Sequence, residues 1–126
     1  MPQSTNIIIK PMSLSTDISA ITEIYTDAVL RTTATYEIDP PSEEEMRHRL
    51  ESVQAAGFPC FVAEDTSTPD STSTLGYAYV SPYRPRPSYR FTVEHSVYVS
   101  SSARRRGVGR LLMRAIIREC ERMGFR

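Results

Sequence analysis

The sequence has little cysteine and no long hydrophobic run. Cys60 and Cys120 are the only cysteines in 126 residues, a number more typical of reduced cytoplasmic thiols than of a disulfide framework. No apolar run approaches the roughly 20 residues that a membrane-spanning helix needs. The first residues carry no positive charge ahead of an apolar segment, so we expect no signal peptide. These absences predict a cytoplasmic protein with no membrane partner.

The chain also lacks net charge, but its charges are unevenly distributed. Residues 1–83 hold 4 basic and 12 acidic side chains, a net charge of −8, whereas residues 84–126 hold 11 arginines and 3 acids, a net charge of +8. A basic segment favours a polyanionic partner such as nucleic acid, an acidic surface or a phosphate-rich cofactor. The alternative is a basic helix face that lies against an acidic one within the same fold.

Composition is otherwise that of an ordinary globular protein. Hydrophobic residues make up 40% and charged residues 24%, which excludes a disordered chain, a collagen-like chain and a coiled coil. A chain of 126 residues is long enough for one hydrophobic core but not for two. We therefore expect a single domain over residues 1–126.

Hydrophobic periodicity predicts four strands and three helices. The strands span 6–10, 58–65, 75–82 and 91–99, and the helices follow 15–17, span 43–56 and span 107–123. Ser15, Thr16 and Asp17 are candidate caps of the first helix, and Ser42 with Glu45 has the spacing of a capping box. The order is β-α-α-β-β-β-α. Three successive strands with hairpin-scale connections indicate an antiparallel sheet with helices before and after it, in an α/β (α+β) fold.

The segment Arg104-Arg105-Arg106-Gly107-Val108-Gly109-Arg110 lies between the last predicted strand and the last helix. Two glycines separated by one residue let a ligand approach the backbone N–H groups closely. A helix N-terminus leaves up to four N–H groups unpaired and carries partial positive charge, so phosphates are its usual ligands. The spacing matches neither a P-loop nor the dinucleotide fingerprint. The alternative is a helix cap with a solvated basic face.

This segment resembles the pyrophosphate-binding loop of the GNAT acetyltransferases. The segment Phe91-Thr92-Val93-Glu94-His95-Ser96-Val97-Tyr98-Val99, with Arg86 and Tyr89 ahead of it, resembles the phosphinothricin N-acetyltransferase branch of that superfamily. Short segments elsewhere fit the same branch in the same order: Tyr36-Glu37, residues 61–64, residues 76–79 and Gly124-Phe125. The resemblance covers nearly the whole chain. It implies the GNAT fold and acetyl transfer from acetyl-CoA to a primary amine of a small amino-acid-like substrate, with no metal.

The resemblance implies two groups of cofactor-binding residues. The strand residues Val97, Tyr98 and Val99 would pair by their backbone with the pantetheine arm, and Val97 and Val99 would also belong to the core. The loop residues Arg104, Arg105, Arg106, Gly107, Val108, Gly109 and Arg110 would bind the pyrophosphate, mainly through backbone N–H groups.

The resemblance also implies roles at the amine site. Glu94 would be the general base, directly or through a water, because an ammonium must lose a proton before it attacks; a salt-bridged or substrate-orienting carboxylate is the alternative. Arg84 and Arg86 would hold the anionic end of the substrate, although exposed loop arginines have the same sequence signature. His95, Ser96, Tyr36 and Glu37 would line or close the pocket.

Members of this family continue beyond the position of Arg126 into a further strand, helix and strands. We therefore expect residues 1–126 to form the N-terminal two-thirds of the family fold, with an unpaired edge on the strand 91–99. An inactive chain that folds or forms a homodimer without turnover is the main alternative. A second alternative is a nucleic-acid-binding module, because arginines recur every four residues from Arg106 to Arg126, but no aromatic residues interleave with them.

Overall fold

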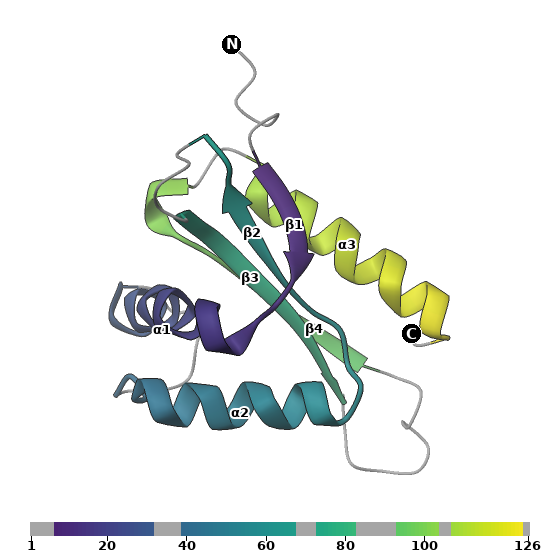
Figure 1. Cartoon of the computed structure of the whole chain (residues 1–126), viewed down its shortest axis with the longest axis horizontal. Helices are drawn as coiled ribbons and strands as arrows, with labels where there is room; N and C mark the ends of the chain where they lie inside the picture. The colour runs from purple at the N-terminus through teal and green to yellow at the C-terminus, as the bar shows by residue number, and fades with distance from the viewer. Residues whose placement is uncertain (1–6, 32–38, 68–72, 83–92, 104–106, 125–126) are drawn as a thin grey trace.

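A computed structural model places a four-stranded sheet between two helices on one face and one helix on the other (Figure 1). It describes residues 7–31, 39–67, 73–82, 93–103 and 107–124. The elements are β1 (Ile7–Pro11), α1 (Leu14–Arg31), α2 (Glu43–Ala55), β2 (Cys60–Asp65), β3 (Ser73–Pro82), β4 (Val93–Val99), the 3-10 helix η3 (Ser101–Ala103) and α3 (Val108–Met123). The predicted order of strands and helices is confirmed.

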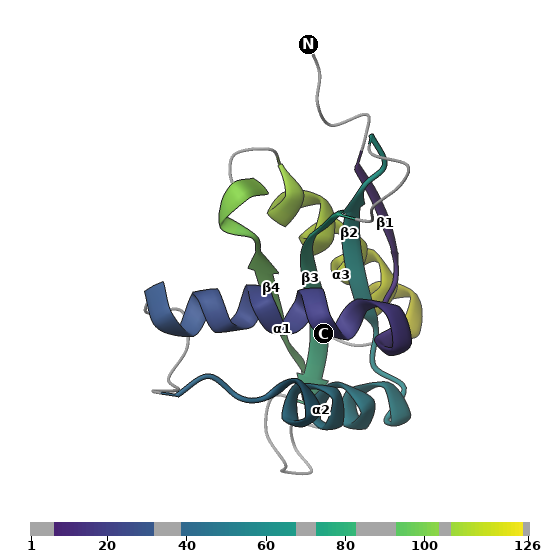
Figure 2. The same cartoon turned by 60° about the vertical axis from the view of Figure 1, so that its left-hand side comes forward.

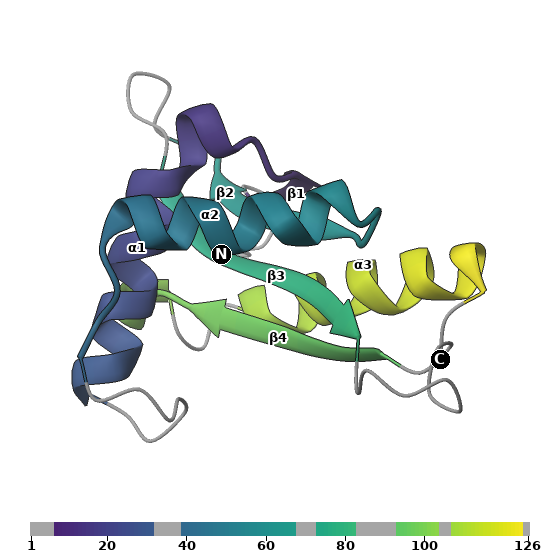
Figure 3. The same cartoon turned by 90° about the horizontal axis from the view of Figure 1, so that it is seen from below.

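The sheet has the order β1-β2-β3-β4, and every neighbouring pair is antiparallel. This confirms the antiparallel sheet that the short connections predicted. β4 stands at one margin, next to β3 (Figure 3). Among the described residues β4 pairs with β3 alone, so its other side is an edge.

The two faces of the sheet belong to two hydrophobic clusters, because successive side chains in a strand alternate between faces. On the α1/α2 face the strands contribute Val62, Tyr77, Tyr79 and Tyr98. On the α3 face they contribute Phe61, Ala63, Ala78, Val80, Val97 and Val99. In Figure 2, α1 crosses in front of the sheet and α3 lies behind it. Val97 and Val99, expected to belong to the core, are partly buried and pack against it.

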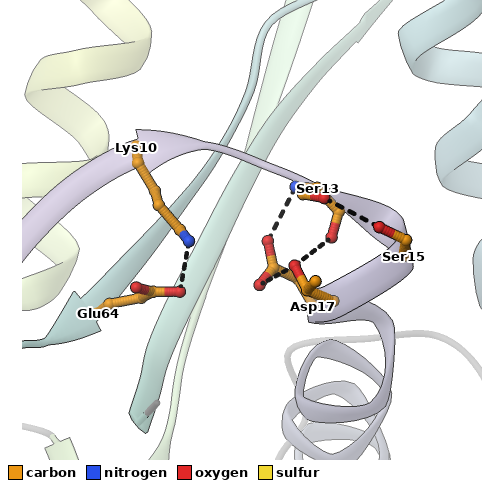
Figure 4. Close-up of polar contacts among 6 residues, drawn as sticks. Lys10, Ser13, Ser15, Asp17 and Glu64 are labelled. Atoms are coloured by element: carbon orange, nitrogen blue, oxygen red, sulfur yellow. Dashed lines mark hydrogen bonds and ion pairs between the residues drawn. The ribbon is translucent and has the colours of Figure 1, made fainter. Parts of the chain in front are cut away.

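The start of α1 differs from the predicted one. The helix begins at Leu14, ahead of the residues that were expected to cap it. Asp17, only 2% exposed, accepts a hydrogen bond of 2.8 Å from the Ser13 backbone N–H, while its own N–H donates to the Ser13 carbonyl at 2.8 Å (Figure 4). Asp17 thus lies inside the first turns and reaches back to the chain ahead of the helix. Asp17 correctly indicated a helix start nearby, but the helix begins at Leu14, three residues before Asp17.

Caps define both ends of α2 as the sequence predicted. The Ser42 hydroxyl accepts the Glu45 backbone N–H at 3.1 Å at the start of α2. At its end, Phe58 N–H donates to the Val53 carbonyl at 3.2 Å across Gly57, whose φ is +86°. This is the bonding of a Schellman motif, and it explains why β2 begins at Cys60 and not at the predicted Phe58.

β1 and β2 form an antiparallel pair that contains one ion pair. Pro11, one residue beyond the predicted strand 6–10, is the last residue of β1 and the register partner of Phe61. Proline is tolerated there because β1 is an edge strand. Farther along, Lys10 Nζ lies 2.8 Å from a carboxylate oxygen of Glu64, a residue that is 8% exposed (Figure 4). This ion pair stabilises a charge that the fold buries.

Close packing at Gly76 brings β3, β4 and α3 together. A Cβ atom at this position would lie 2.7 Å from the Tyr98 carbonyl oxygen and 3.2 Å from side-chain atoms of Val108 and Leu112. Glycine is therefore required for the first turn of α3 to approach the sheet this closely.

In the part of the chain that the structure describes, no helix combines the length and the apolar character that a membrane crossing demands.

Candidate active site

The N-terminus of α3 is a helix end without a side-chain cap. Gly107 occupies the cap position with φ +80°, a left-handed conformation, and makes no side-chain cap hydrogen bond. The first bond of the helix runs from the Leu111 N–H to the Gly107 carbonyl at 3.1 Å. The N–H groups of Val108, Gly109 and Arg110 precede it, so they have no partner four residues back within α3. A group of N–H donors at a helix start attracts anions.

The fold holds this helix end in place. Val108 is 1% exposed and Leu112 is fully buried, so the first turn is anchored in the core on the α3 face. A Cβ added at Gly109 would meet the Val99 side chain at 3.6 Å, so the glycine lies directly beside the end of β4. The N-terminus of α3 is therefore anchored by its buried first turn, next to the last residues of that strand.

Basic side chains follow α3 away from its start. Arg110, Arg114 and Arg118 are exposed and line a shallow hollow of about 420 Å³ with Met113 and Ile117. The charge of Arg122, one turn farther, is paired with Glu119. The predicted arginine stripe is thus real over these turns. Arg104, Arg105 and Arg106 lie outside the described residues.

The β3–β4 register places the predicted base next to the α1/α2 face. Glu94 is the register partner of Ser81, Ser96 of Tyr79 and Tyr98 of Tyr77. Directly opposed residues in an antiparallel pair share a face of the sheet. Since Tyr77, Tyr79 and Tyr98 pack toward α1 and α2, the register position of Glu94 belongs to this face too.

A cavity of about 210 Å³ lies on the same face, between α1, α2 and β3. Its lining combines aromatic and apolar side chains with few polar groups. Tyr25 contributes from α1, Arg49 from α2, and Tyr77, Tyr79 and Ser81 from β3. Ser81 is the register partner of Glu94, so the cavity adjoins the position of the predicted base. Such a pocket, apolar with a few placed polar groups, is the usual form of a small-molecule site.

Tyrosine rings form one wall of this region. Tyr77 stacks on Tyr79 with centroids 6.3 Å apart and on Tyr98 at 5.2 Å, and Tyr98 meets Tyr25 edge-on at 5.2 Å. The Tyr77 hydroxyl is buried and has no hydrogen-bond partner among the described residues. Burial of this hydroxyl raises the pKa of Tyr77 well above its usual range, so the phenol is a neutral donor.

Sequence reasoning did not identify this cavity. The alternation of Tyr77 and Tyr79 placed both on one face of a strand, but Tyr25 and Arg49 come from helices about 30 to 50 residues earlier in the chain. No local pattern relates these residues to one another. They meet only because both helices pack on the same face of β3.

The register separates the two predicted neighbours of Glu94. Ser96 shares its face with Tyr79, whereas His95 is exposed and is the partner of Val80, a residue of the α3 face. The structure thus brings Ser96 to the cavity side and His95 to the other side.

The predicted pocket residues Tyr36, Glu37, Arg84 and Arg86 lie outside the described residues. Within the described ranges no group of three or more His, Cys, Asp and Glu side chains is arranged to hold a metal ion.

The two parts of the site stand at opposite ends of β4. Glu94 is its second residue, and Val99, beside the α3 N-terminus, is its last. They are five residue steps apart in an extended strand, or about 17 Å at about 3.3 Å per step. The helix N-terminus and the register position of Glu94 are therefore far enough apart along one strand for a long ligand to span both.

Comparisons with known proteins agree on one family. The model of the acetyltransferase (GNAT) family matches residues 20–126. A phosphinothricin N-acetyltransferase of Alcaligenes faecalis is 47% identical over 105 residues, which cover 83% of this chain and 51% of that protein. An L-methionine sulfoximine/L-methionine sulfone acetyltransferase of Salmonella typhimurium is 36% identical over 108 residues, 86% of this chain and 60% of that protein.

Solved structures give the same result. The crystal structure of a GNAT superfamily phosphinothricin acetyltransferase from Sinorhizobium meliloti, in complex with AcCoA, has a TM-score of 0.88 and 40% identity. The match covers 96% of this chain and 63% of that one. The chain therefore spans from about half to somewhat under two thirds of the length of these relatives.

Proposed function

Because the chain belongs to the GNAT acetyltransferase family, we propose that it takes part in N-acetyl transfer from acetyl-CoA to the primary amine of a small amino-acid-like molecule. The observation that carries this proposal is the placement of the α3 N-terminus, where Gly107 has a left-handed conformation and Gly109 lies beside Val99. Val99 is the last residue of the strand whose second residue is Glu94. This placement supports one long ligand that reaches from the helix end to the carboxylate.

The residues present fit acetyl-CoA. The N–H groups of Val108, Gly109 and Arg110 and the exposed Arg110 side chain would hold the pyrophosphate, together with Arg104 to Arg106. The edge of β4 at Val97, Tyr98 and Val99 would hold the pantetheine arm by its backbone. When bound, acetyl-CoA supplies an acetyl group activated as a thioester.

Glu94 is the proposed proton acceptor. A primary amine is mostly an ammonium near neutral pH, and it becomes a nucleophile only after losing a proton. The register position of Glu94, opposite Ser81, borders the cavity, where an amine-bearing molecule has room to bind. Ser96, on the same face, would contact that molecule; His95 stays a prediction.

The class of acceptor follows from the relatives. Those proteins are named for phosphinothricin and for L-methionine sulfoximine and sulfone, all small amino-acid-like molecules. For this chain we propose an acceptor of that kind, with Arg84 and Arg86 binding its anionic end and Tyr36 and Glu37 closing the amine site. A cytoplasmic location and a homodimer stay predictions.

The test is calorimetric titration of the 126-residue chain with acetyl-CoA, followed by assay of thiol release with L-phosphinothricin and L-methionine sulfone. Desulfo-CoA and a short DNA duplex serve as comparisons. We expect saturable binding of acetyl-CoA and of desulfo-CoA, none of the duplex, and release of thiol that depends on the amine. Binding of the duplex without acetyl-CoA would replace the proposal with a nucleic-acid-binding module, and cofactor binding without turnover would favour the inactive chain.

A further inference from the structure

The two edges of the sheet are protected differently against further strand pairing. β1 is five residues long and ends with Lys10 and Pro11, and lysine or proline on an edge strand discourages another strand from pairing with it. β4 is seven residues long and includes no proline, lysine or arginine. Valine and tyrosine, which favour extended strands, fill four of its seven positions. The outer edge of β4 is therefore suited to pairing with a further strand.

The hydrogen bonds between β3 and β4 determine which backbone groups of β4 face outward. Opposed residues in an antiparallel pair alternate between bonded and non-bonded pairs. The Ser100 N–H donates to the Leu75 carbonyl at 2.7 Å. This bonded pair lies one step past the Val99–Gly76 register pair, which is therefore non-bonded. By alternation, the residues of β4 whose backbone N–H and C=O groups point away from β3 are Val93, His95, Val97 and Val99.

A second hydrogen bond agrees with this assignment. The Val80 N–H donates at 3.2 Å to the carbonyl just ahead of β2, so it does not point toward His95, its register partner on β4. Tyr98 belongs to the residues that bond to β3. Val97 and Val99 are thus the proposed contacts of the pantetheine arm that offer outward backbone groups.

The side chains of β4 are less buried than those of the inner strands. His95 is exposed and residues 96–99 are half-buried. On β2 and β3, by contrast, Val62 and Tyr77 are fully buried. Figure 2 and Figure 3 both show the last turns of α1 running past β4, and Leu30, in the last turn of α1, is 66% exposed. A strand added to β4 would therefore bury apolar surface as well as backbone groups.

The strand that fits this edge best is a second β4. In an antiparallel pair centred on Ser96, every outward residue is opposite another outward residue, as His95 is opposite Val97 of the second copy. Each such pair exchanges two hydrogen bonds, so the four pairs give about eight. Glu94 is then opposite Tyr98 of the second copy and not opposite its own equivalent, so no like charges oppose each other.

We propose that the outer edge of β4 binds a second copy of this chain, as an antiparallel strand pair centred on Ser96 that joins the two sheets into one. A two-fold contact of this kind is self-complementary and closes on itself, so a dimer is the end point. The pairing occupies the backbone groups of Val97 and Val99 that are proposed to hold the pantetheine arm. Self-association and acetyl-CoA binding then exclude each other, a consequence that rests on the proposed function.

Sedimentation velocity of the 126-residue chain over a concentration series tests the interface. We expect a reversible equilibrium between monomer and dimer without ligand. Val97→Pro removes an outward N–H and keeps the bonds to β3, because the Val97 N–H is not part of that ladder. It should weaken the dimer at least about tenfold, since each copy loses a donor. Val97→Ile keeps the N–H and should dimerise like the wild type, with thermal unfolding as the check that both variants fold.

A disulfide cross-link tests the register and decides the inference even where Val97→Pro fails to fold. Ser96→Cys would place two thiols at directly opposed, non-bonded positions whose Cα atoms are about 4.5 Å apart, a separation that a disulfide spans. Ser100→Cys is the matched control, because its two copies would stand eight positions apart along the ladder, about 26 Å. Cys60 and Cys120 are buried and common to both variants. With oxidised glutathione, we expect a covalent dimer of Ser96→Cys and none of Ser100→Cys.

The outcomes separate this inference from the proposed function. A wild-type chain that stays monomeric at every concentration, a dimer that Val97→Pro leaves intact, or equal cross-linking of the two cysteine variants would overturn the inference. Saturating acetyl-CoA should convert the dimer to monomer, and acetyl-CoA bound to an undissociated dimer would overturn the mutual exclusion. If acetyl-CoA does not bind at all, the proposed function fails, while sedimentation and cross-linking still decide the strand pairing.

Discussion

Ser81 on β3 and Glu94 on β4 are register partners, and Ser81 also lines the cavity that α1 and α2 cover. This one pairing connects two features that lie far apart in the sequence, a predicted proton acceptor and a pocket. At the other end of the same strand, Val99 lies beside Gly109 in the uncapped first turn of α3. β4 therefore sets the distance between the charged end and the reactive end of the proposed ligand.

Gly107→Glu is expected to abolish acetyl-CoA binding. The added carboxylate would stand at the N–H groups of the α3 N-terminus and repel the pyrophosphate. The left-handed backbone at φ +80° would add about 1 kcal/mol of destabilisation with any side chain. Isothermal titration with acetyl-CoA is the measurement.

Gly124→Glu is the matched control, because Gly124 has φ +86° at the opposite end of the same helix. It should lose similar stability and keep its affinity. Unchanged affinity in Gly107→Glu would remove the anion site from α3.

Glu94→Gln is expected to lower kcat by about 10²- to 10⁴-fold, the usual contribution of a general base. The amide keeps the size of the side chain but takes up no proton. Acetyl-CoA affinity should stay close to that of the wild type, since the anion-binding end lies about 17 Å away along β4. Thiol release across a pH series checks this, and equal turnover at every pH would end the role of Glu94 as base.

Gly76→Ala is expected to destabilise the fold by about 1–3 kcal/mol. The new methyl group would lie 2.7 Å from the Tyr98 carbonyl oxygen, a backbone atom that cannot turn away as the end of a flexible side chain can. Urea unfolding measures the loss. Gly57→Ala has open space around its Cβ but a φ of +86°, so it should cost only about 1 kcal/mol, and a larger loss there than at Gly76 would contradict the packing argument.

Tyr77→Phe is expected to stabilise the ligand-free chain by about 1 kcal/mol or more, because it removes a buried hydroxyl that has no partner among the described residues. The ring and its stacking on Tyr79 and Tyr98 are kept. Thermal or urea unfolding without ligand is sufficient. A destabilised Tyr77→Phe would show that the hydroxyl has a hydrogen-bond partner in the folded chain.

Lys10→Met is expected to weaken the fold, since it leaves the buried Glu64 carboxylate without its cation. The hydrogen bond from Lys10 to Glu64 raises the pKa of Lys10 above its ordinary value of 10.5. A raised pKa means that the stabilisation is complete below pH 10.5 and is lost as the pH rises through the pKa of the folded state. The difference in unfolding free energy between wild type and variant should therefore shrink above pH 10.5, and a difference that stays constant there would contradict the ion pair.

Local sequence signals predicted the elements well where a single residue decides a boundary. Ser42 caps α2, and Gly57 and Gly124 end helices, because a hydroxyl at a cap and a glycine with positive φ act through bonds within a few residues. The start of α1 was predicted too late because Asp17 fits either as a cap or as a residue that reaches back to Ser13. Which of the two holds depends on how β1 delivers the chain to the helix.

The sequence by itself determined the order of strands and helices, the antiparallel sheet and the glycine-rich helix start after β4, since these follow from periodicity, short connections and backbone freedom. Only the tertiary structure decided that Ser81 pairs with Glu94, that His95 lies on the opposite face, and that Tyr25, Arg49 and Tyr77 share one cavity. A register and a cavity are properties of packed surfaces from distant segments, and a shift of one residue in β4 would reverse which side chains meet α1 and α2.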